Sequence, residues 1–203
     1  MSHPLEKIEY KPISVRKLLV EMKNLSELMI DLAYSAALFN DKELAEEVLE
    51  LENRVDVLAY LLNMEIMIAA RDSKDAEALV GVSVVASATD KISDAAADIA
   101  AVVTQKIGIH PIVSEIFRKV EERLTRVKVY EDSVLAAKTI DELDLAARMG
   151  VDIIAIRRDK EWIIDPGEKE QIKPGDILIA RGAPEGIKEF KELAEAKLKK
   201  LED

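Results

Sequence analysis

The stretch "DIIAIRRDKEWIIDPGEKEQIKPGDILIARG", residues 152–182, decides the fold of the C-terminal part of the chain. It opens with the apolar run Asp152–Ile156 and continues with two further runs, Trp162–Ile164 and Ile177–Ala180. A turn sequence, Lys173–Asp176, precedes the last run. Short apolar runs separated by Gly, Pro and Asp are typical of β-strands. The stretch therefore predicts three short strands joined by turns.

The segments around this stretch complete a small α+β unit. Val127–Tyr130 alternates in the manner of a strand,. Thr139–Met149 predicts a short helix that ends at Gly150, and a final helix is expected to begin at Ala183,. The composition changes near Arg126, where we place the boundary between an N-terminal domain, residues 1–126, and a C-terminal domain, residues 127–203.

The first domain has the apolar spacing of long helices. Between residues 14 and 39 the apolar positions recur in steps of three and four, which places them on one helix face,. Ser14 can accept hydrogen bonds from the first turn of this helix. A break at Asn40-Asp41 precedes a second ladder, from Leu44 to Leu62.

The next segment, residues 74–107, is rich in Ala and Val and ends before Gly108. It is too apolar for a surface helix, so we expect it to be the helix most enclosed by its neighbours. His110-Pro111 should begin a shorter helix over residues 111–125. The expected fold is thus α+β, with an antiparallel bundle of three long helices and one short helix before the small C-terminal unit.

The bulk composition excludes several classes of protein. With 49% apolar and 34% charged residues, the chain is expected to fold,. Its formal net charge of −11 argues against nucleic-acid binding, and the absence of Cys excludes disulfides and thiolate chemistry,. We expect no membrane span and no signal segment, hence a cytoplasmic protein. The many Glu and Lys residues with few Gln indicate a thermophilic source.

The sequence offers no set of catalytic residues. Both histidines, His3 and His110, lie outside residues 127–203, so that domain has no Ser–His–Asp set,. Its acidic residues are scattered among lysines. We therefore predict a binding or assembly module rather than an enzyme.

Four segments of the second half together resemble the TrkA-C domain, the C-terminal lobe of RCK units that regulate potassium channels and transporters. They are Val127–Val129, Ser133–Leu143 ("SVLAAKTIDEL"), Gly150–Arg158 with its "IIAIRR" strand, and Ile172–Leu178 ("IKPGDIL"). The resemblance implies a homodimer that binds a small regulatory ligand at its interface.

The same resemblance points to Ile156, Arg157 and Arg158 as ligand-binding residues, because the corresponding strand lines the ligand cleft in members that bind a cyclic dinucleotide. Paired guanidinium groups suit a phosphate. Neighbours on a strand point to opposite faces, so only one arginine should line the cleft, and we favour Arg157. The alternative is that both arginines are solvated and pair with Asp159 or Glu161.

One departure from a complete RCK unit concerns the segment before this domain. A nucleotide-binding Rossmann lobe needs a glycine-rich phosphate turn after a strand. Residues 1–126 contain only Gly81 and Gly108, and their spacing indicates helices. Nucleotide binding of the usual RCK kind is therefore not expected.

Acidic residues recur four apart on the predicted helices, which places them on common faces. The sets are Glu27/Asp31, Glu52/Asp56 and Asp90/Asp94/Asp98. Carboxylates that face each other across a bundle can bind a divalent metal. Alternatively, these sets are solvated helix faces, with Arg54 and Lys91 near enough to compensate their charge.

The segments "ELENRVDVL" (50–58) and "ATDKISDAAADIA" (88–100) resemble the signature helices of the PhoU family of phosphate-uptake regulators. The family has three-helix repeats, and some members bind metal through acid-x-x-x-Asp pairs. The resemblance implies a metal site at Glu52, Asp56, Asp90 and Asp94. The chain departs from the family at four positions, which are Asp90, Lys91, Ser93 and Asp98. It has room for one repeat, which could pair with a second copy.

These observations together predict a PhoU-like bundle followed by a TrkA-C domain. The expected function is that of a cytoplasmic regulatory subunit of potassium or other cation transport. Its expected partners are a second copy of the chain and a membrane transporter or channel, and its ligand is a divalent metal or a small anion. The alternative is a metal-binding PhoU-type regulator of phosphate uptake, in which the TrkA-C domain serves only to dimerise the protein.

Overall fold

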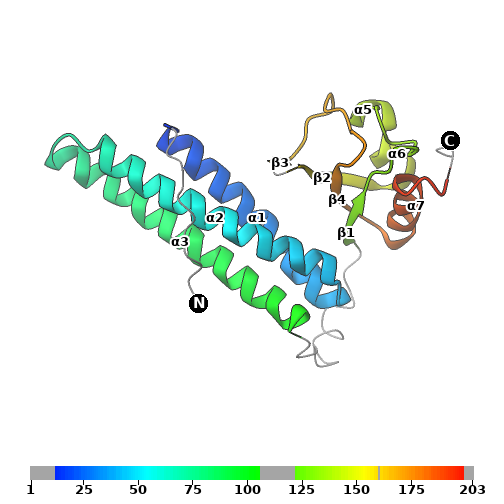
Figure 1. The fold of residues 1–203 in the computed structure, drawn as a ribbon, viewed down its shortest axis with the longest axis horizontal. Coiled ribbons are helices and arrows are strands. Elements are labelled where there is room, and N and C mark those ends of the chain that lie inside the picture. Colours follow the sequence, from blue (N-terminus) through cyan, green and yellow to red (C-terminus); the bar gives the residue numbers. More distant parts are fainter. Residues whose placement is uncertain (1–11, 106–121, 160, 199–203) are drawn as a thin grey trace. The chain divides into compact units, whose positions relative to one another are not determined.

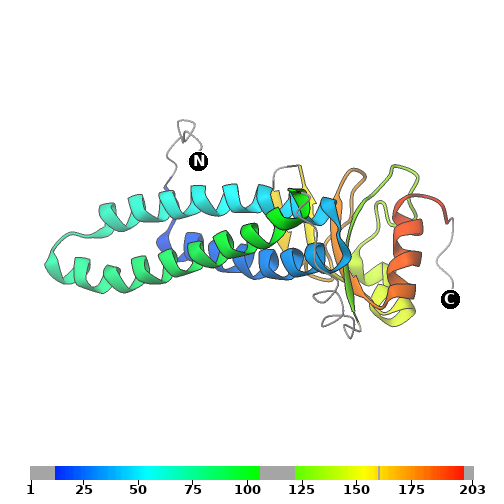
Figure 2. The same ribbon diagram turned by 90° about the horizontal axis from the view of Figure 1, so that it is seen from below.

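The structure is a computed structural model that describes residues 12–105, 122–159 and 161–198. The chain divides into two compact units, Met1–Ile109 and His110–Asp203. Three long helices run side by side in the first unit (Figures 1 and 2), as predicted. They are α1 (Val15–Phe39), α2 (Lys42–Ala69) and α3 (Ser73–Thr104).

Each of the three helices begins at a side chain that caps its free N–H groups. Ser14 accepts a hydrogen bond from the backbone N–H of Lys17, which confirms the expected start of α1. Asp41 and Asp72 each accept two backbone N–H groups from the first turns of α2 and α3. Such caps satisfy donors that have no partner within the helix.

The expectation that the third helix is the most enclosed is wrong. Only six residues of α3 are buried, all from Ala86 onward, whereas the shorter α1 buries ten. The tip of the α2–α3 hairpin extends beyond the start of α1 (Figures 1 and 2), so this part of α3 lacks a third helix. Val80 and Val84 are 59% and 64% exposed as a result.

The second unit contains a four-stranded antiparallel sheet in the order β1-β4-β2-β3. The strands are β1 (Arg123–Lys128), β2 (Val151–Arg158), β3 (Glu161–Ile164) and β4 (Ile177–Gly182). The three strands of the 152–182 stretch are thus confirmed. Because β1 begins at Arg123, the domain boundary that we placed near Arg126 falls inside a strand. Residues 111–121 of the expected short helix lie outside the described residues, and 123–125 are strand.

Three short helices cover one face of this sheet: α5 (Ile140–Leu143), α6 (Leu145–Met149) and α7 (Pro184–Ala194). The single helix predicted over 139–149 is two helices, because Asp144 adopts a left-handed conformation (φ 44°) between them. Gly150 ends α6 at φ 64°, as expected. The core between helices and sheet includes Leu135, Leu143, Ile153, Ile156, Leu178, Ile187 and Phe190.

Two glycines allow the elements of this core to approach one another closely. A Cβ atom at Gly182 would lie 2.6 Å from the carbonyl oxygen of Gly150. A Cβ atom at Gly186, in α7, would overlap the carbonyl oxygen of Met149, at the end of α6. Any side chain at these positions would therefore push backbone against backbone.

Candidate functional site

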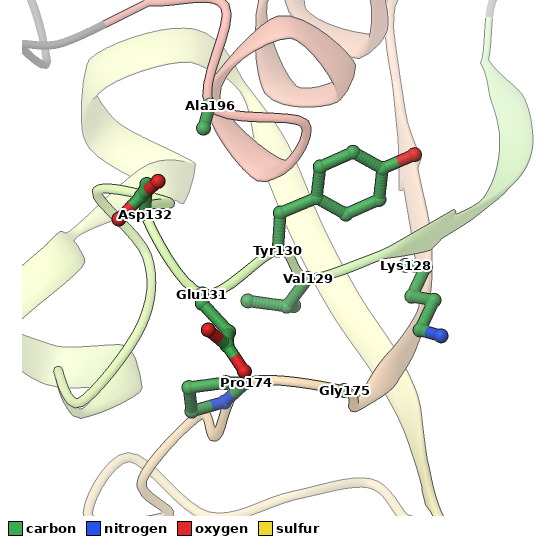
Figure 3. A pocket seen from close by; sticks show the side chains of 8 residues that line it. All are labelled: Lys128, Val129, Tyr130, Glu131, Asp132, Pro174, Gly175 and Ala196. Carbon is green, nitrogen blue, oxygen red and sulfur yellow. The ribbon is translucent and has the colours of Figure 1, made fainter.

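A shallow hollow of about 590 Å³ lies beside the turn that precedes β4 (Figure 3). It is lined by Lys128, Val129, Tyr130, Glu131, Asp132, Pro174, Gly175 and Ala196. Two of its side chains are carboxylates and one is an ammonium group, so its charge does not favour an anion. It contains none of the predicted ligand residues.

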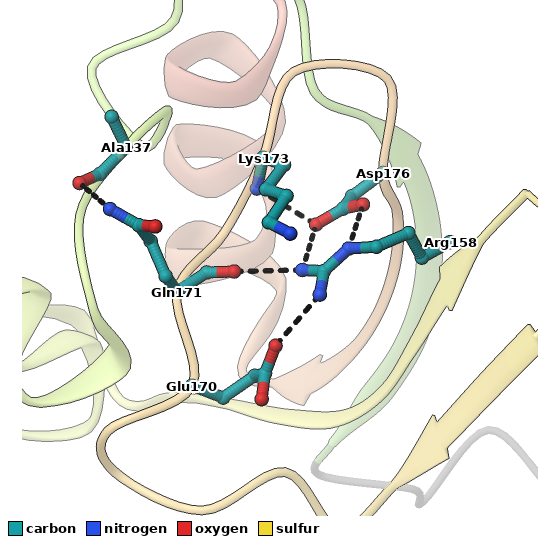
Figure 4. A network of polar contacts seen from close by, with 6 residues as sticks. All are labelled: Ala137, Arg158, Glu170, Gln171, Lys173 and Asp176. Atoms are coloured by element: carbon teal, nitrogen blue, oxygen red, sulfur yellow. Dashed lines mark hydrogen bonds and ion pairs between the residues drawn. The ribbon is translucent and has the colours of Figure 1, made fainter.

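Arg158 forms the centre of a polar network at the end of β2 (Figure 4). Its guanidinium group donates to both carboxylate oxygens of Asp176, at 3.0 Å from Nε and 2.8 Å from Nη2. It also donates to the Glu170 carboxylate at 2.9 Å and to the Gln171 carbonyl oxygen at 2.7 Å. A two-pronged pair of this kind fixes the guanidinium in position and orientation. Arg158 therefore ties β2 to the loop that leads into β4.

The carboxylate of Asp176 is almost completely buried, with 2% of its side chain exposed. Besides Arg158, it accepts the backbone N–H of Lys173 at 2.8 Å, within a turn where Gly175 has φ 88°. The hydrogen bond with Asp176 raises the pKa of Arg158, so the guanidinium stays charged. We interpreted Lys173–Asp176 only as a turn. The missed signal was an acidic residue directly before a buried apolar strand.

The structure separates the three predicted ligand residues. Ile156 is fully buried in the core. A bulge between Ile153 and Ala155 shifts the alternation of β2, so both Ile153 and Ile156 face the core,. Arg158, two residues beyond Ile156, points to the same side and pairs with Asp176 and Glu170 rather than with Asp159 or Glu161. Arg157 points to the opposite face of the sheet.

This opposite face, here called the outer face, combines cations with apolar side chains. The strand registers place Lys128, Ile177, Arg157 and Trp162 in one row across all four strands. The adjacent row contains Arg126, Ile179, Ala155 and Ile164. The three residues in the middle of these rows are buried, namely Ala155, Ile177 and Ile179. The three cations and Trp162 are exposed or half-buried. These cations can hold a phosphate while the indole of Trp162 contacts a flat organic ring. Only the pairing register, not sequence spacing, shows this grouping.

Three of the four predicted metal ligands meet between α2 and α3. Carboxylate oxygens of Glu52, Asp56 and Asp94 lie within 4.8 Å of one another. Asp90 does not belong to this set, but one of its oxygens, Oδ1, is buried without a hydrogen-bond partner in the described part of the chain. Arg54, which the alternative of solvated helix faces assigns to compensating this charge, pairs with Glu21 at 2.7 Å.

The electrostatics of the cluster show that its charges are poorly compensated. Partial burial, followed by the charge of Asp94, raises the pKa of Asp56. Partial burial and then the charges of Asp94 and Asp56 raise the pKa of Asp90. An oxygen-only set of this kind fits a hard divalent cation, which would offset the repulsion.

Glu27, from another predicted acidic pair, forms an ion pair with Lys23 at 2.6 Å.

Comparison with known proteins matches each unit to a family. The PhoU domain family matches residues 19–103, and the TrkA-C domain family matches residues 124–195. "Probable potassium channel protein 2" of Methanocaldococcus jannaschii is 36% identical over 78 residues, which are 38% of this chain and 23% of that protein. "Ktr system potassium uptake protein C" of Bacillus subtilis is 36% identical over 74 residues, or 36% of this chain and 34% of that protein.

Among solved structures, the chain is similar to the RCK C domain of the potassium transport protein KtrA in complex with cyclic diadenosine monophosphate. The identity is 32%, with a TM-score of 0.34, over 40% of this chain and 94% of that one. The chain spans about a quarter to a third of the length of the two curated relatives, 23% and 34%. No helix within the described ranges is long and apolar enough to cross a membrane. The chain thus joins a PhoU domain to a TrkA-C domain.

Proposed function

We propose that this protein is a regulatory component of potassium or other cation transport, in which the TrkA-C domain dimerises and senses a small anionic ligand. The observation that carries the proposal is the 36% identity to a potassium channel protein and to a potassium uptake protein, over 78 and 74 residues. These lengths are close to that of the TrkA-C match, residues 124–195. The role is not enzymatic, and the protein acts in the cytoplasm on a membrane transporter or channel.

The edge of the sheet supports the dimer. In the order β1-β4-β2-β3, strand β3 has a ladder partner on one side only, among the described strands. This edge carries the apolar residues Trp162, Ile163 and Ile164, each only half-buried. An apolar edge on a domain of this size gains from being covered, and a second copy can cover it.

The outer face supports the choice of an anion as ligand. The whole chain carries a net charge of −11, so its overall field repels anions and a binding site needs fixed local cations,. Arg126 and Arg157 provide them on neighbouring rows of the sheet. The hydrogen bonds of Arg158 hold the end of β2 in place, so the backbone from which the Arg157 side chain projects is also fixed. A twofold axis would double these charges around one ligand.

Replacing Arg157 by Ala should weaken ligand binding about tenfold or more, because one charge-assisted hydrogen bond is worth roughly 1.5–3 kcal/mol. The measurement is calorimetry of the full chain with a panel of nucleotides and cyclic dinucleotides that includes cyclic diadenosine monophosphate. Arg148 is exposed on α6, and Arg148→Ala removes a charge of the same sign away from the outer face. This variant serves as the control. Light scattering should show a dimer for all three proteins. If no ligand binds the wild type, or both variants bind equally well, the anion-sensing role is wrong.

A second candidate function rests on the carboxylate cluster. We propose that Glu52, Asp56 and Asp94, with Asp90 nearby, bind a divalent metal such as manganese or iron. The close approach of three carboxylates and the unpartnered Asp90 Oδ1 support this site. If the metal site is the functional centre, the protein is a PhoU-type regulator of phosphate uptake and its TrkA-C domain serves for assembly.

Replacing Asp94 by Asn should have opposite effects with and without metal. The metal-free bundle should gain about 0.5 kcal/mol because a like-charge contact is relieved. Stoichiometric metal, measured by elemental analysis of protein purified without chelator, should be lost. Asp98→Asn, one turn further along α3 and outside the cluster, should leave the metal content unchanged.

The pH dependence gives an independent check of the same cluster. The pKa values of Asp56 and Asp90 in the folded, metal-free unit are raised above the ordinary 3.8. At a pH between 3.8 and the raised pKa, the folded unit therefore binds more protons than the unfolded chain,. Its stability should therefore rise as the pH falls toward 3.8. With saturating Mn²⁺ the trend should reverse, because protons compete for the ligands. Thermal melts that show no difference with and without Mn²⁺ would contradict the metal site.

A further inference from the structure

Helix α3 has a second apolar stripe in addition to the one that packs in the bundle. The buried stripe consists of Ala86, Thr89, Ser93, Ala96, Ala100 and Val103. The second stripe consists of the residue before each of these, which are Val85, Ala88, Ile92, Ala95, Ile99 and Val102. One residue turns a helix by about 100°, so the second stripe lies on a flank of α3.

The second stripe is accessible over most of its length. Val85 and Ile92 are 52% and 43% exposed, and Ala88 and Ala95 are exposed as well. Asp90 and Asp94 each follow a residue of the buried stripe, so the acidic cluster lies on the other flank of the helix. The stripe is therefore a surface separate from the candidate metal site.

We infer that this stripe docks against the same stripe of a second copy of the chain, with the two α3 helices antiparallel. Its spacing alternates three and four, which is the repeat of a helix that packs along another helix. We place the twofold axis that relates the two copies between Ile92 and Ala95. In this antiparallel register, Ile92 of one copy lies opposite Ala95 of the second copy, and Ala88 lies opposite Ile99 of the second copy. Each large side chain then fits against a small one, so the stripe is complementary to itself.

Charged residues beside the stripe favour the same register. Lys91 directly precedes Ile92, and Asp98 directly precedes Ile99. In the antiparallel register, Lys91 lies across from Asp98 of the second copy, and the twofold axis makes this pair twice. A shift by seven residues would bring the two Lys91 side chains together. Complementarity of both size and charge singles out a second copy as the occupant, rather than an unrelated helix.

The chain contains no cysteine, so single thiols can report on this interface. In the full chain, Ala95→Cys should be joined into a covalent dimer by a short bis-maleimide. Ser87→Cys, exposed on the same helix but outside the stripe, should be joined far less. Adding Lys91→Glu to Ala95→Cys should lower the yield roughly tenfold, since two attractive pairs become repulsive. Further addition of Asp98→Lys should restore it.

Equal cross-linking at both positions, or no rescue by the reciprocal charge swap, would overturn the inference. A thiol at position 95 that is neither cross-linked nor modified by N-ethylmaleimide would also overturn it. The chain's own residues would then cover the stripe. Pairing through α3 is not part of the proposed function and can be refuted separately from it. A protein that is dimeric by light scattering but not joined through Ala95→Cys would refute pairing through α3 and leave the TrkA-C dimer in place.

Discussion

Replacing Asp176 by Asn should lower the free energy of unfolding of the TrkA-C unit by about 3 kcal/mol. The substitution removes the carboxylate that holds Arg158 through two hydrogen bonds and that accepts the N–H of Lys173. A buried cation without its partner is strongly destabilising. This loss of stability should lie near the lower end of the range usual for a broken buried ion pair, because the Arg158 side chain is 23% exposed and keeps its hydrogen bond to Glu170,.

The only tryptophan of the chain makes this effect measurable in one unit. Trp162 lies in β3, so its fluorescence reports urea unfolding of the TrkA-C unit and not of the helical bundle. Asp165→Asn, in an exposed turn with φ 50°, makes the same change of charge and should leave the midpoint unchanged. Equal midpoints for the two variants would mean that the Arg158 network contributes nothing to stability.

Replacing Gly186 by Ala should cost about 2 kcal/mol in the same measurement. The new methyl group would overlap the carbonyl oxygen of Met149 and would lie 3.1 Å from Val151 Cγ2. The first of these contacts is with backbone at the end of α6, so no side-chain rotation can relieve it, and α7 must move away from α6.

Gly167→Ala is the matched control, because a Cβ atom there would meet nothing within 4 Å. It should unfold at nearly the same urea concentration as the wild type. A Gly186→Ala variant as stable as this control would show that α7 can shift without loss of packing. In that case the close approach of α6 and α7 would not be a constraint on the fold.

Local signals in the sequence predicted most of the elements. Ser14 and Asp41 each act as the helix cap that their side chains favour, and Gly150 ends α6. The prediction from composition that α3 is the most enclosed helix was wrong. An Ala- and Val-rich sequence shows that a helix is apolar, but not how many neighbouring elements surround it. Asp144 divides one predicted helix in two through a backbone conformation that no spacing rule indicates.

The candidate sites were predictable to different degrees. Spacing by four places Glu52 and Asp56 on one face of α2, and Asp94 completes the set because α2 and α3 are neighbours. The outer face could not be predicted, since Arg126 and Arg157 are far apart in the chain and only the strand register places them on the same face of the sheet. The position of Asp176 directly before an apolar strand was a usable signal, but its pairing with Arg158 could not be predicted because it depends on tertiary packing.

The bulge in β2 determines how any mutagenesis of the "RR" pair must be interpreted. Strict alternation from Val151 and Ile153 would turn Arg157 inward, but the extra residue at the bulge turns Arg158 inward instead. Two adjacent and chemically identical side chains therefore have separate surroundings, one in the network with Asp176 and one on the outer face of the sheet. An alanine scan that measures only ligand affinity could not tell a loss of contacts with a ligand from a loss of the Arg158–Asp176 pair, and a double mutant would report the destabilised domain as a loss of binding. Lys at position 158 would not remedy this, because an ammonium group cannot reproduce the two-pronged contact with Asp176.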